Sequence, residues 1–270
     1  MDDKVLEEKQ IMAMRVLVTG SASGIGRASA HALAAAGEGS SLLLVDTAQD
    51  KLAEVSEELK SKGHRVRTLA CDLSSPAEIE KVAAEAETFL GGLDALISNA
   101  GVLSNAPLTE LSLDSYELAF AVNTRPTWLL AKACYPLLKA AKGAIVATAS
   151  ISATQPTPPH GSYSASKAAL VMLIKQMAFE FGPDGIRCNC VSPGTIHTGM
   201  TDSVYGDEKL RAERAANIPL RRVGSPEDVA AVIAFLASPA AAYISGVDIA
   251  VDGGISTALM PTLRKGAVPK

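Results

Sequence analysis

The chain has 270 residues, of which 48% are hydrophobic and 20% are charged, and its formal net charge at pH 7 is −4. This length and apolar content suffice for one large core, while the weak negative charge, without a dense run of Lys or Arg, argues against a nucleic-acid or anionic-membrane surface. No apolar stretch reaches the roughly 18 residues of a membrane-spanning helix. We therefore expect a soluble, cytoplasmic protein whose partners are small molecules.

The composition does not change abruptly along the chain, and no linker interrupts it. We expect one domain over residues 14–258, an N-terminal extension at 1–13 and a C-terminal tail at 259–270. The first ten residues mix charges and lack the apolar core of a secretory signal. The four cysteines are Cys71, Cys134, Cys188 and Cys190. Their spacing matches no zinc pattern, so we predict no metal site and interpret them as buried packing thiols in a reducing compartment.

Short apolar runs rich in branched residues alternate with longer segments of helical pattern. The candidate strands are 16–18, 42–45, 66–71, 95–97, 144–146, 188–191 and 247–251. Continuous apolar runs separated by helices are typical of a parallel sheet that is covered on both faces. The sequence therefore predicts an α/β fold, a Rossmann-like, doubly wound, seven-stranded parallel sheet with helices on both faces.

A glycine-rich turn, Thr19-Gly20-Ser21-Ala22-Ser23-Gly24-Ile25-Gly26, follows the first strand. Its glycines allow a tight turn, close approach to a pyrophosphate and packing of the next helix on the sheet. Asp46 ends the second strand, where a carboxylate accepts hydrogen bonds from a ribose and repels the extra phosphate of NADP, so NAD is favoured over NADP. A methyltransferase also has a glycine turn, and Asp46 as a surface turn residue is the alternative interpretation.

Helix starts follow recognisable capping patterns. Ser75-Pro76-Ala77-Glu78 and Ser225-Pro226-Glu227-Asp228 each combine an N-cap serine, a first-turn proline and an acidic third residue. Another helix is predicted over about 162–181. It carries Tyr163 and Lys167, four residues apart on one helical face, where the lysine ammonium favours the ionised form of the phenol. A tyrosine with a lowered pKa is a usable acid and base.

These segments resemble the short-chain dehydrogenase/reductase family, in its single-domain core branch, over residues 14–256. The glycine turn matches the family's phosphate loop, and 71–73 resembles its adenine-contacting segment. Residues 98–101, Ser-Asn-Ala-Gly, resemble its Asn-Asn-Ala-Gly motif, with Ser98 in place of the first asparagine. We expect this change to alter a strand-end hydrogen bond and to leave the fold intact.

The resemblance implies a catalytic tetrad of Asn123, Ser150, Tyr163 and Lys167. Tyr163 would transfer the proton at the substrate oxygen, Ser150 would hydrogen-bond that oxygen, Lys167 would hold the nicotinamide ribose and lower the pKa of Tyr163, and Asn123 would anchor a relay water. Ser152 is a nearby alternative to Ser150. Residues 124–126 depart from the family pattern, and Pro126 predicts a helix irregularity.

The glycine turn and the resemblance together also predict the cofactor contacts. They are Gly20, Ser23, Gly24, Ile25, Gly26, Asp46, Asp72, Leu73, Asn99, Ala100, Gly101, Tyr163, Lys167, Pro193, Gly194, Ile196 and Thr198. Among these, Ile196 and Thr198 would contact the nicotinamide carboxamide. Fixing the nicotinamide in this way orients the face that meets the substrate.

Substrate specificity is expected from the loops 102–105, 154–160 and 197–218. Gln155, His160 and His197 are candidate substrate contacts that suit a polyol or sugar, although His160 beside Pro158-Pro159 also fits an exposed loop. The leading hypothesis is an NAD-dependent oxidoreductase that interconverts a secondary alcohol and a ketone. A sugar (aldose) 1-dehydrogenase and a catalytically silent NAD(H)-binding regulator are the alternatives. The resemblance further implies a homo-oligomer, either a dimer or a tetramer.

Overall fold

A computed structural model describes residues 13–201 and 206–258, so the expected tail and nearly all of the expected N-terminal extension lie outside the described residues. The seven predicted strands form one parallel sheet in the order β3-β2-β1-β4-β5-β6-β7, which confirms the predicted fold class. The strands are β1 (Arg15–Thr19), β2 (Ser41–Asp46), β3 (Arg65–Ala70), β4 (Ala95–Ser98), β5 (Ala144–Thr148), β6 (Arg187–Pro193) and β7 (Asp248–Val251).

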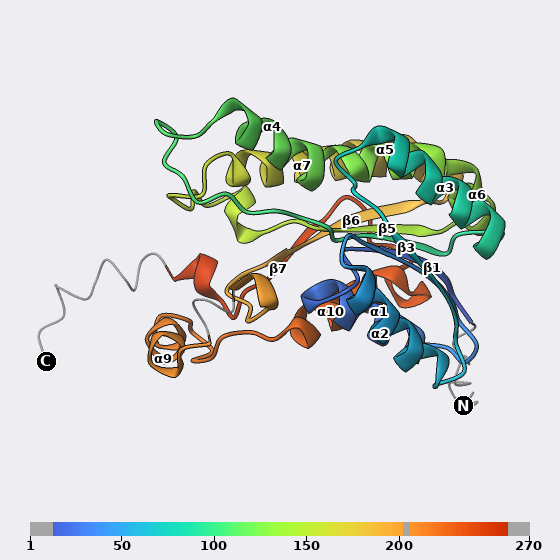
Figure 1. Cartoon of the computed structure of the whole chain (residues 1–270), viewed down its shortest axis with the longest axis horizontal. Helices are drawn as coiled ribbons and strands as arrows, with labels where there is room; N and C mark the ends of the chain where they lie inside the picture. Colours follow the sequence, from blue (N-terminus) through green and yellow to red (C-terminus); the bar gives the residue numbers. More distant parts are fainter. Residues whose placement is uncertain (1–12, 202–205, 259–270) are drawn as a thin grey trace, which may run out of the picture.

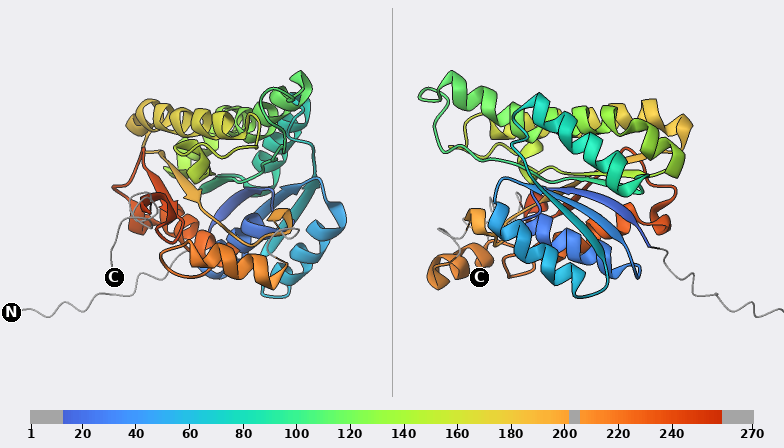
Figure 2. Two further views of the ribbon diagram at one scale, coloured as in Figure 1. Left: turned by 90° about the vertical axis from the view of Figure 1, so that its left-hand side faces the viewer. Right: turned by 45° about the vertical axis from the view of Figure 1, so that its right-hand side comes forward.

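Helices cover both faces of the sheet, as Figures 1 and 2 show. One layer contains α3 (Pro76–Leu90), α4 (Leu113–Asn123), α5 (Arg125–Ala133), α6 (Tyr135–Ala141) and α7 (Tyr163–Phe181). The other contains α1 (Gly24–Ala35), α2 (Gln49–Lys60) and α10 (Pro226–Ala237). The short helix α9 (Glu208–Ala216) lies beyond the carboxyl ends of the strands, away from both layers.

Successive residues of each strand pack alternately into two separate apolar cores, one on each face of the sheet. Leu17 and Leu96 point to the α3–α7 side, whereas Val16 and Val18 point to the α1–α10 side, and all four side chains are fully buried. Because alternate residues of a strand face opposite ways, a strand buried on both faces must be apolar throughout. This is the physical reason for the continuous apolar runs of the sequence.

The predicted helix boundaries are confirmed. The Ser75 hydroxyl accepts the Glu78 N–H at the start of α3, and Ser225 and Asp228 form a capping box at the start of α10. The irregularity expected near Pro126 is a break at Thr124, which separates α4 from α5. The break lets α5 take Pro126 in its first turn, where a missing N–H costs no helical hydrogen bond.

Two further sequence predictions concern buried side chains. The four cysteines are buried and free of disulfides, as packing thiols should be. The Ser98 hydroxyl lies 2.6 Å from that of Thr127, so the serine at this strand end pairs with a helix hydroxyl and the fold is retained.

Over residues 13–201 and 206–258, no helix combines the length and the apolar character needed to cross a membrane.

Candidate active site

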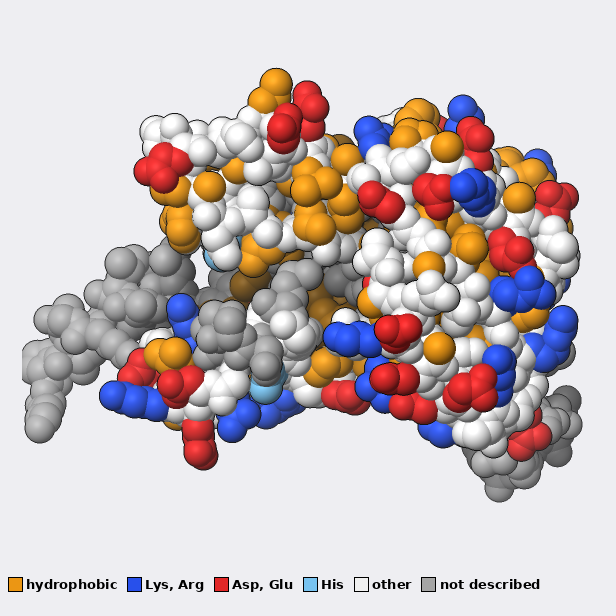
Figure 3. All heavy atoms as spheres, in the orientation of Figure 1, with side chains coloured by type: hydrophobic (Ala, Val, Ile, Leu, Met, Phe, Trp, Pro, Cys, Tyr) orange, Lys and Arg blue, Asp and Glu red, His pale blue; other side chains and the backbone are white. Residues whose placement is uncertain are grey.

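A pocket of about 460 Å³ lies at the carboxyl ends of the strands. Strands β1 and β4 are neighbours in the sheet although two strands separate them in the sequence, so the chain leaves them in opposite directions. Such a switch point opens a crevice, and ligands of open α/β sheets bind there. Figure 3 shows a hollow on this face, between the part that carries α4 and the part that carries α9.

Most of the predicted site residues line this one pocket. They are Gly20, Ser23, Gly24, Ile25, Asp46, Asn99, Ala100, Gly101, Ser150, His160, Tyr163, Lys167, Pro193, Gly194, Ile196 and Thr198. They come from five different strand ends and from the first turns of two helices. The sheet thus gathers residues that are up to 178 positions apart in the sequence (198 − 20).

The glycine turn has the geometry of a phosphate cradle. Gly20 and Gly24 adopt φ of +64° and +53°, in the left-handed region that favours glycine. A Cβ at Gly26 would lie 1.9 Å from the Gly20 carbonyl oxygen, which only glycine avoids. The turn leads directly into α1, whose N-terminus favours negative charge. These features fit the pyrophosphate of a dinucleotide.

Asn99, which lines the pocket, connects neighbouring strand ends through its side chain. Its amide group donates to the carbonyl oxygens of Thr19 and Gly20, at 3.2 and 3.1 Å, and its oxygen accepts the Thr148 hydroxyl at 3.0 Å. One side chain therefore ties the ends of β1, β4 and β5 together. This fixes the glycine turn relative to the strand end that leads to Ser150.

Asp46 presents a carboxylate to the opposite end of the pocket. Its two oxygens accept the backbone N–H groups of Ala22 and Ala48 at 3.0 and 3.1 Å, which orients the carboxylate and leaves further lone pairs for a ligand. Arg27, the base nearest to the turn, pairs instead with Glu58 of α2 at 2.6 Å. No Lys or Arg other than Lys167 stands among the described residues that line the pocket.

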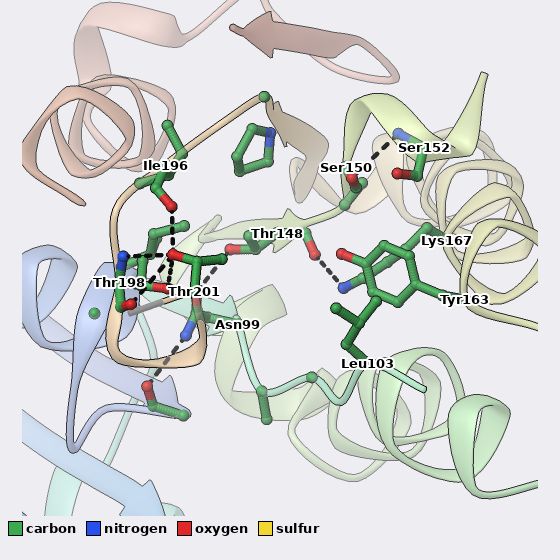
Figure 4. A pocket seen from close by; sticks show the side chains of 18 of the residues that line it. Asn99, Leu103, Thr148, Ser150, Ser152, Tyr163, Lys167, Ile196, Thr198 and Thr201 are labelled. Atoms are coloured by element: carbon green, nitrogen blue, oxygen red, sulfur yellow. Dashed lines mark hydrogen bonds between the residues drawn. The ribbon is translucent and has the colours of Figure 1, made fainter. Parts of the chain in front are cut away.

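The candidate catalytic side chains lie close together at the N-terminal end of α7. Figure 4 shows Tyr163 and Ser150 on one side of the pocket, with Lys167 behind the tyrosine ring. The Lys167 ammonium lies 5.8 Å from the centre of that ring and donates to the Thr148 carbonyl oxygen at 2.8 Å. The Ser150 hydroxyl accepts the N–H of Ser152 at 3.1 Å. Of the two serines, Ser150 is the one whose hydrogen bond lowers the pKa of Tyr163.

The pKa of Tyr163 differs from the sequence expectation. Burial raises it, and the hydrogen bond with Ser150 offsets this only in part. Lys167 is buried as well, which lowers the pKa of its own ammonium to about 8. The Lys167 ammonium donates to the Thr148 carbonyl, and the pKa of the phenol is raised by its own desolvation.

Asn123 is buried behind the pocket and does not line it. Its side chain accepts the Val102 N–H at 2.7 Å and donates to the Val102 carbonyl and to the Ser166 hydroxyl. A Cβ at Gly101 would lie 3.2 Å from the Asn123 amide oxygen and 3.5 Å from the Lys167 nitrogen. The asparagine therefore holds the segment after β4 against α7, close to Lys167.

Five other predicted contacts also lie outside the pocket lining. One is Gly26, which packs against the Gly20 carbonyl within the glycine turn. Leu73 is buried in the core, and Asp72 accepts the Ser74 N–H at 2.8 Å within its own turn. Gln155 is exposed on the loop after β5. The backbone N–H of His197 donates to the Gly224 carbonyl at 2.9 Å.

Thr201 is a pocket residue that sequence reasoning missed. Its hydroxyl accepts the Thr198 N–H at 2.9 Å and donates to the Ile196 carbonyl at 2.8 Å, which closes the turn that carries both predicted carboxamide contacts (Figure 4). A Cβ at Gly24 would lie 3.4 Å from Thr198, so this turn faces the glycine turn across the pocket. A threonine within a loop carries no distinguishing sequence signal.

Comparison with known proteins identifies the family. A family model described as Enoyl-(Acyl carrier protein) reductase matches residues 20–256. The chain belongs to the short-chain dehydrogenase/reductase family. A tropinone reductase homologue of Arabidopsis thaliana is 36% identical over 248 residues, which are 91% of this chain and 80% of that protein.

Solved structures of this family agree with the fold. The L-sorbose reductase of Gluconobacter frateurii, solved with NADPH and L-sorbose, is 33% identical with a TM-score of 0.85, over 91% of this chain and 97% of that one. A 7α-hydroxysteroid dehydrogenase, solved with NADH and 7-oxo glycochenodeoxycholic acid, is 30% identical with a TM-score of 0.84, over 91% of this chain and 95% of that one. The protein is therefore an oxidoreductase that acts on CH–OH or ketone groups with NAD(P).

Proposed function

We propose that this short-chain dehydrogenase/reductase interconverts a secondary alcohol and a ketone, with Tyr163 as the general acid and base and NAD as the preferred cofactor. One observation carries the proposal: Ser150, Tyr163 and Lys167 line the same pocket as the glycine turn and Asp46. Hydride transfer needs the nicotinamide, the substrate oxygen and a proton donor within one enclosed space. The shared lining of one pocket supports this assignment.

Each side chain has a role that its surroundings support. Burial raises the pKa of Tyr163, so the phenol is protonated at neutral pH and can donate to a ketone oxygen during reduction. Ser150 supplies a second hydrogen bond to that oxygen, and Lys167 would bind the ribose of the cofactor. When bound, the nicotinamide ring supplies or accepts the hydride. In the oxidative direction the alcohol proton returns to Tyr163.

The preference for NAD rests on Asp46. Its carboxylate faces the pocket and is held by two backbone N–H groups, while Arg27 is engaged by Glu58. A negative charge at this position attracts ribose hydroxyls and opposes a 2′-phosphate. The L-sorbose reductase relative was solved with NADPH, and the assay therefore compares the two cofactors directly.

The test is absorbance at 340 nm with NADH or NADPH and a panel of aliphatic, cyclic and hydroxylated ketones, and with the corresponding alcohols and aldoses in the oxidative direction. The proposal predicts turnover with a higher kcat/KM for NADH than for NADPH. Turnover of aldoses but not of ketones would favour the sugar 1-dehydrogenase instead. Tight NADH binding without any turnover would favour a silent regulator.

We also propose a cytoplasmic homo-oligomer. The buried thiols suit a reducing compartment, and α7 exposes two large apolar side chains, Met172 at 64% and Phe179 at 84% of their surface. Light scattering coupled to size-exclusion chromatography tests the oligomer. The proposal predicts a dimer or a tetramer, and a single monomeric species at micromolar concentration would contradict it.

A further inference from the structure

One wall of the pocket is built from polar side chains of the loop between β5 and α7. Ser150, Ser152, Thr157 and His160 all belong to this loop and all line the pocket. Tyr163 follows at the start of α7, and its N–H donates to the His160 carbonyl at 3.0 Å. The wall is therefore fixed in position relative to the residue that meets the reacting oxygen.

His160 is held by the loop across the pocket. Its Nδ1 lies 2.8 Å from the amide oxygen of Asn105, and the Ser104 hydroxyl donates to its carbonyl at 3.4 Å. A β-bridge pairs it with Ala106. Both the backbone and the ring of His160 are thus tied to residues 104–106. An imidazole with these restraints presents a defined edge to the pocket.

The contact with Asn105 decides which nitrogen of His160 carries the proton. An amide oxygen can only accept a hydrogen bond, so Nδ1 donates, and Nε2 of the neutral ring is left as an acceptor. An acceptor nitrogen binds a ligand group that donates a hydrogen bond. Among the common substituents of alcohol and ketone substrates, the donor is a hydroxyl group.

Ser152 presents a second acceptor on the same wall. The Thr157 hydroxyl donates to the Gln155 carbonyl at 3.2 Å, so the Ser152 hydroxyl, 2.7 Å from Thr157, must donate its own proton to Thr157. This leaves the lone pairs of Ser152 to accept a hydrogen bond. Two acceptors on one wall suit a substrate that carries more than one hydroxyl group.

We propose that Ser152 and His160 select substrates with a hydroxyl group beside the reacting carbon, such as neutral polyols and the corresponding hydroxyketones. The inference rests on the proposed function, because it presumes that Tyr163 holds the reacting oxygen. It assigns the substrate class within that function. An acceptor that a bound ligand covers without offering a donor costs free energy, so the wall also discriminates against ketones that have no neighbouring hydroxyl.

The test compares kcat/KM for 3-hydroxy-2-butanone and for its methyl ether, 3-methoxy-2-butanone. The two ketones have similarly activated carbonyl groups, but only the first has a hydroxyl donor. We expect the wild type to prefer the hydroxyketone by about tenfold or more, the factor that one hydrogen bond of about 1.4 kcal/mol provides. His160→Leu should lose that preference with an unchanged Kd for NADH, whereas His160→Gln, which keeps an acceptor, should retain part of it. Ser152→Ala provides a second, independent loss of an acceptor if the leucine variant does not fold.

Each outcome has a separate meaning. Turnover of both ketones with equal kcat/KM by the wild type overturns the inference and leaves the proposed function standing. A preference that survives unchanged in both His160→Leu and Ser152→Ala also overturns it. Absence of turnover with every ketone, despite NADH binding, refutes the proposed function and the inference together.

Discussion

Replacing Lys167 by methionine should make the protein more stable at pH 7 while it abolishes turnover. The lysine side chain is 3% exposed, and burial lowers the pKa of its ammonium from 10.5 to about 8. The unfolded chain therefore binds this proton more tightly than the folded chain does. At pH 7 the folded state bears a cost of about 3 kcal/mol for the buried charge, relative to a neutral lysine.

Methionine removes that cost but leaves the Thr148 carbonyl without its donor, which costs about 1 to 2 kcal/mol. We expect a net gain of about 1 to 2 kcal/mol at pH 7, or a Tm increase of roughly 2 to 8 °C. The sign of the pH dependence is also fixed. Because the pKa is lowered on folding, the wild type gains stability as the pH rises from about 8 towards 10.5, and the variant lacks this gain.

Urea unfolding followed by circular dichroism at pH 7 and pH 10 measures both effects. At pH 10 the folded wild type has largely lost the proton, and the residual cost is below about 1 kcal/mol, so the advantage of the variant should vanish. Lys132→Met on α5 is a matched control, because this lysine lies over the partly exposed Trp128 ring. A Lys167→Met variant that is less stable than the wild type at pH 7 would refute the reasoning. The same difference in the free energy of unfolding between variant and wild type at both pH values would also refute it.

Three further predictions follow from individual hydrogen bonds. Asp46→Asn should raise the Kd for NADH by about tenfold while it changes the Kd for NADPH little. An equal rise in the Kd for both cofactors would contradict the role of the Asp46 charge. Thr201→Ala should raise the Kd for NADH roughly three- to tenfold by releasing the turn at Thr198, whereas Thr201→Ser, which keeps the hydroxyl, should stay within about twofold of the wild type in fluorescence titrations. The hydrogen bonds from Arg222 and the Ser225 N–H hold the pKa of Asp228 at about 2, below its ordinary value. Because this pKa is lowered on folding, Asp228→Asn should cost stability above about pH 4, and its difference from the wild type should shrink as the pH falls towards 2; a constant difference would contradict this.

The fold could be predicted because its signals are local. Runs such as 42–45 must be apolar at every residue when both faces are covered, and Ser75 and Ser225 mark helix starts by residue type alone. The spacing of Tyr163 and Lys167 likewise requires only a helix. In each case the residue type at a given spacing determines the structure, without long-range information.

What the sequence did not reveal depends on tertiary contacts. The acceptor for Lys167 is a backbone carbonyl, that of Thr148, which no side-chain pattern can indicate. The raised pKa of Tyr163 follows from burial, and burial is a property of the assembled pocket. The family resemblance singled out Asn123, but its hydrogen bonds with the Val102 backbone depend on how the segment after β4 folds back.

The central claim is that Tyr163 moves the proton in a reaction that depends on a nicotinamide cofactor. Single-turnover decay of NADH absorbance, in wild type and Tyr163→Phe mixed with the best ketone of the panel, tests it most directly. The account predicts a rate lower by about 10² to 10⁴-fold in the variant, with the Kd for NADH unchanged within about twofold. A variant that reduces the ketone at a rate close to that of the wild type would contradict the assignment of Tyr163.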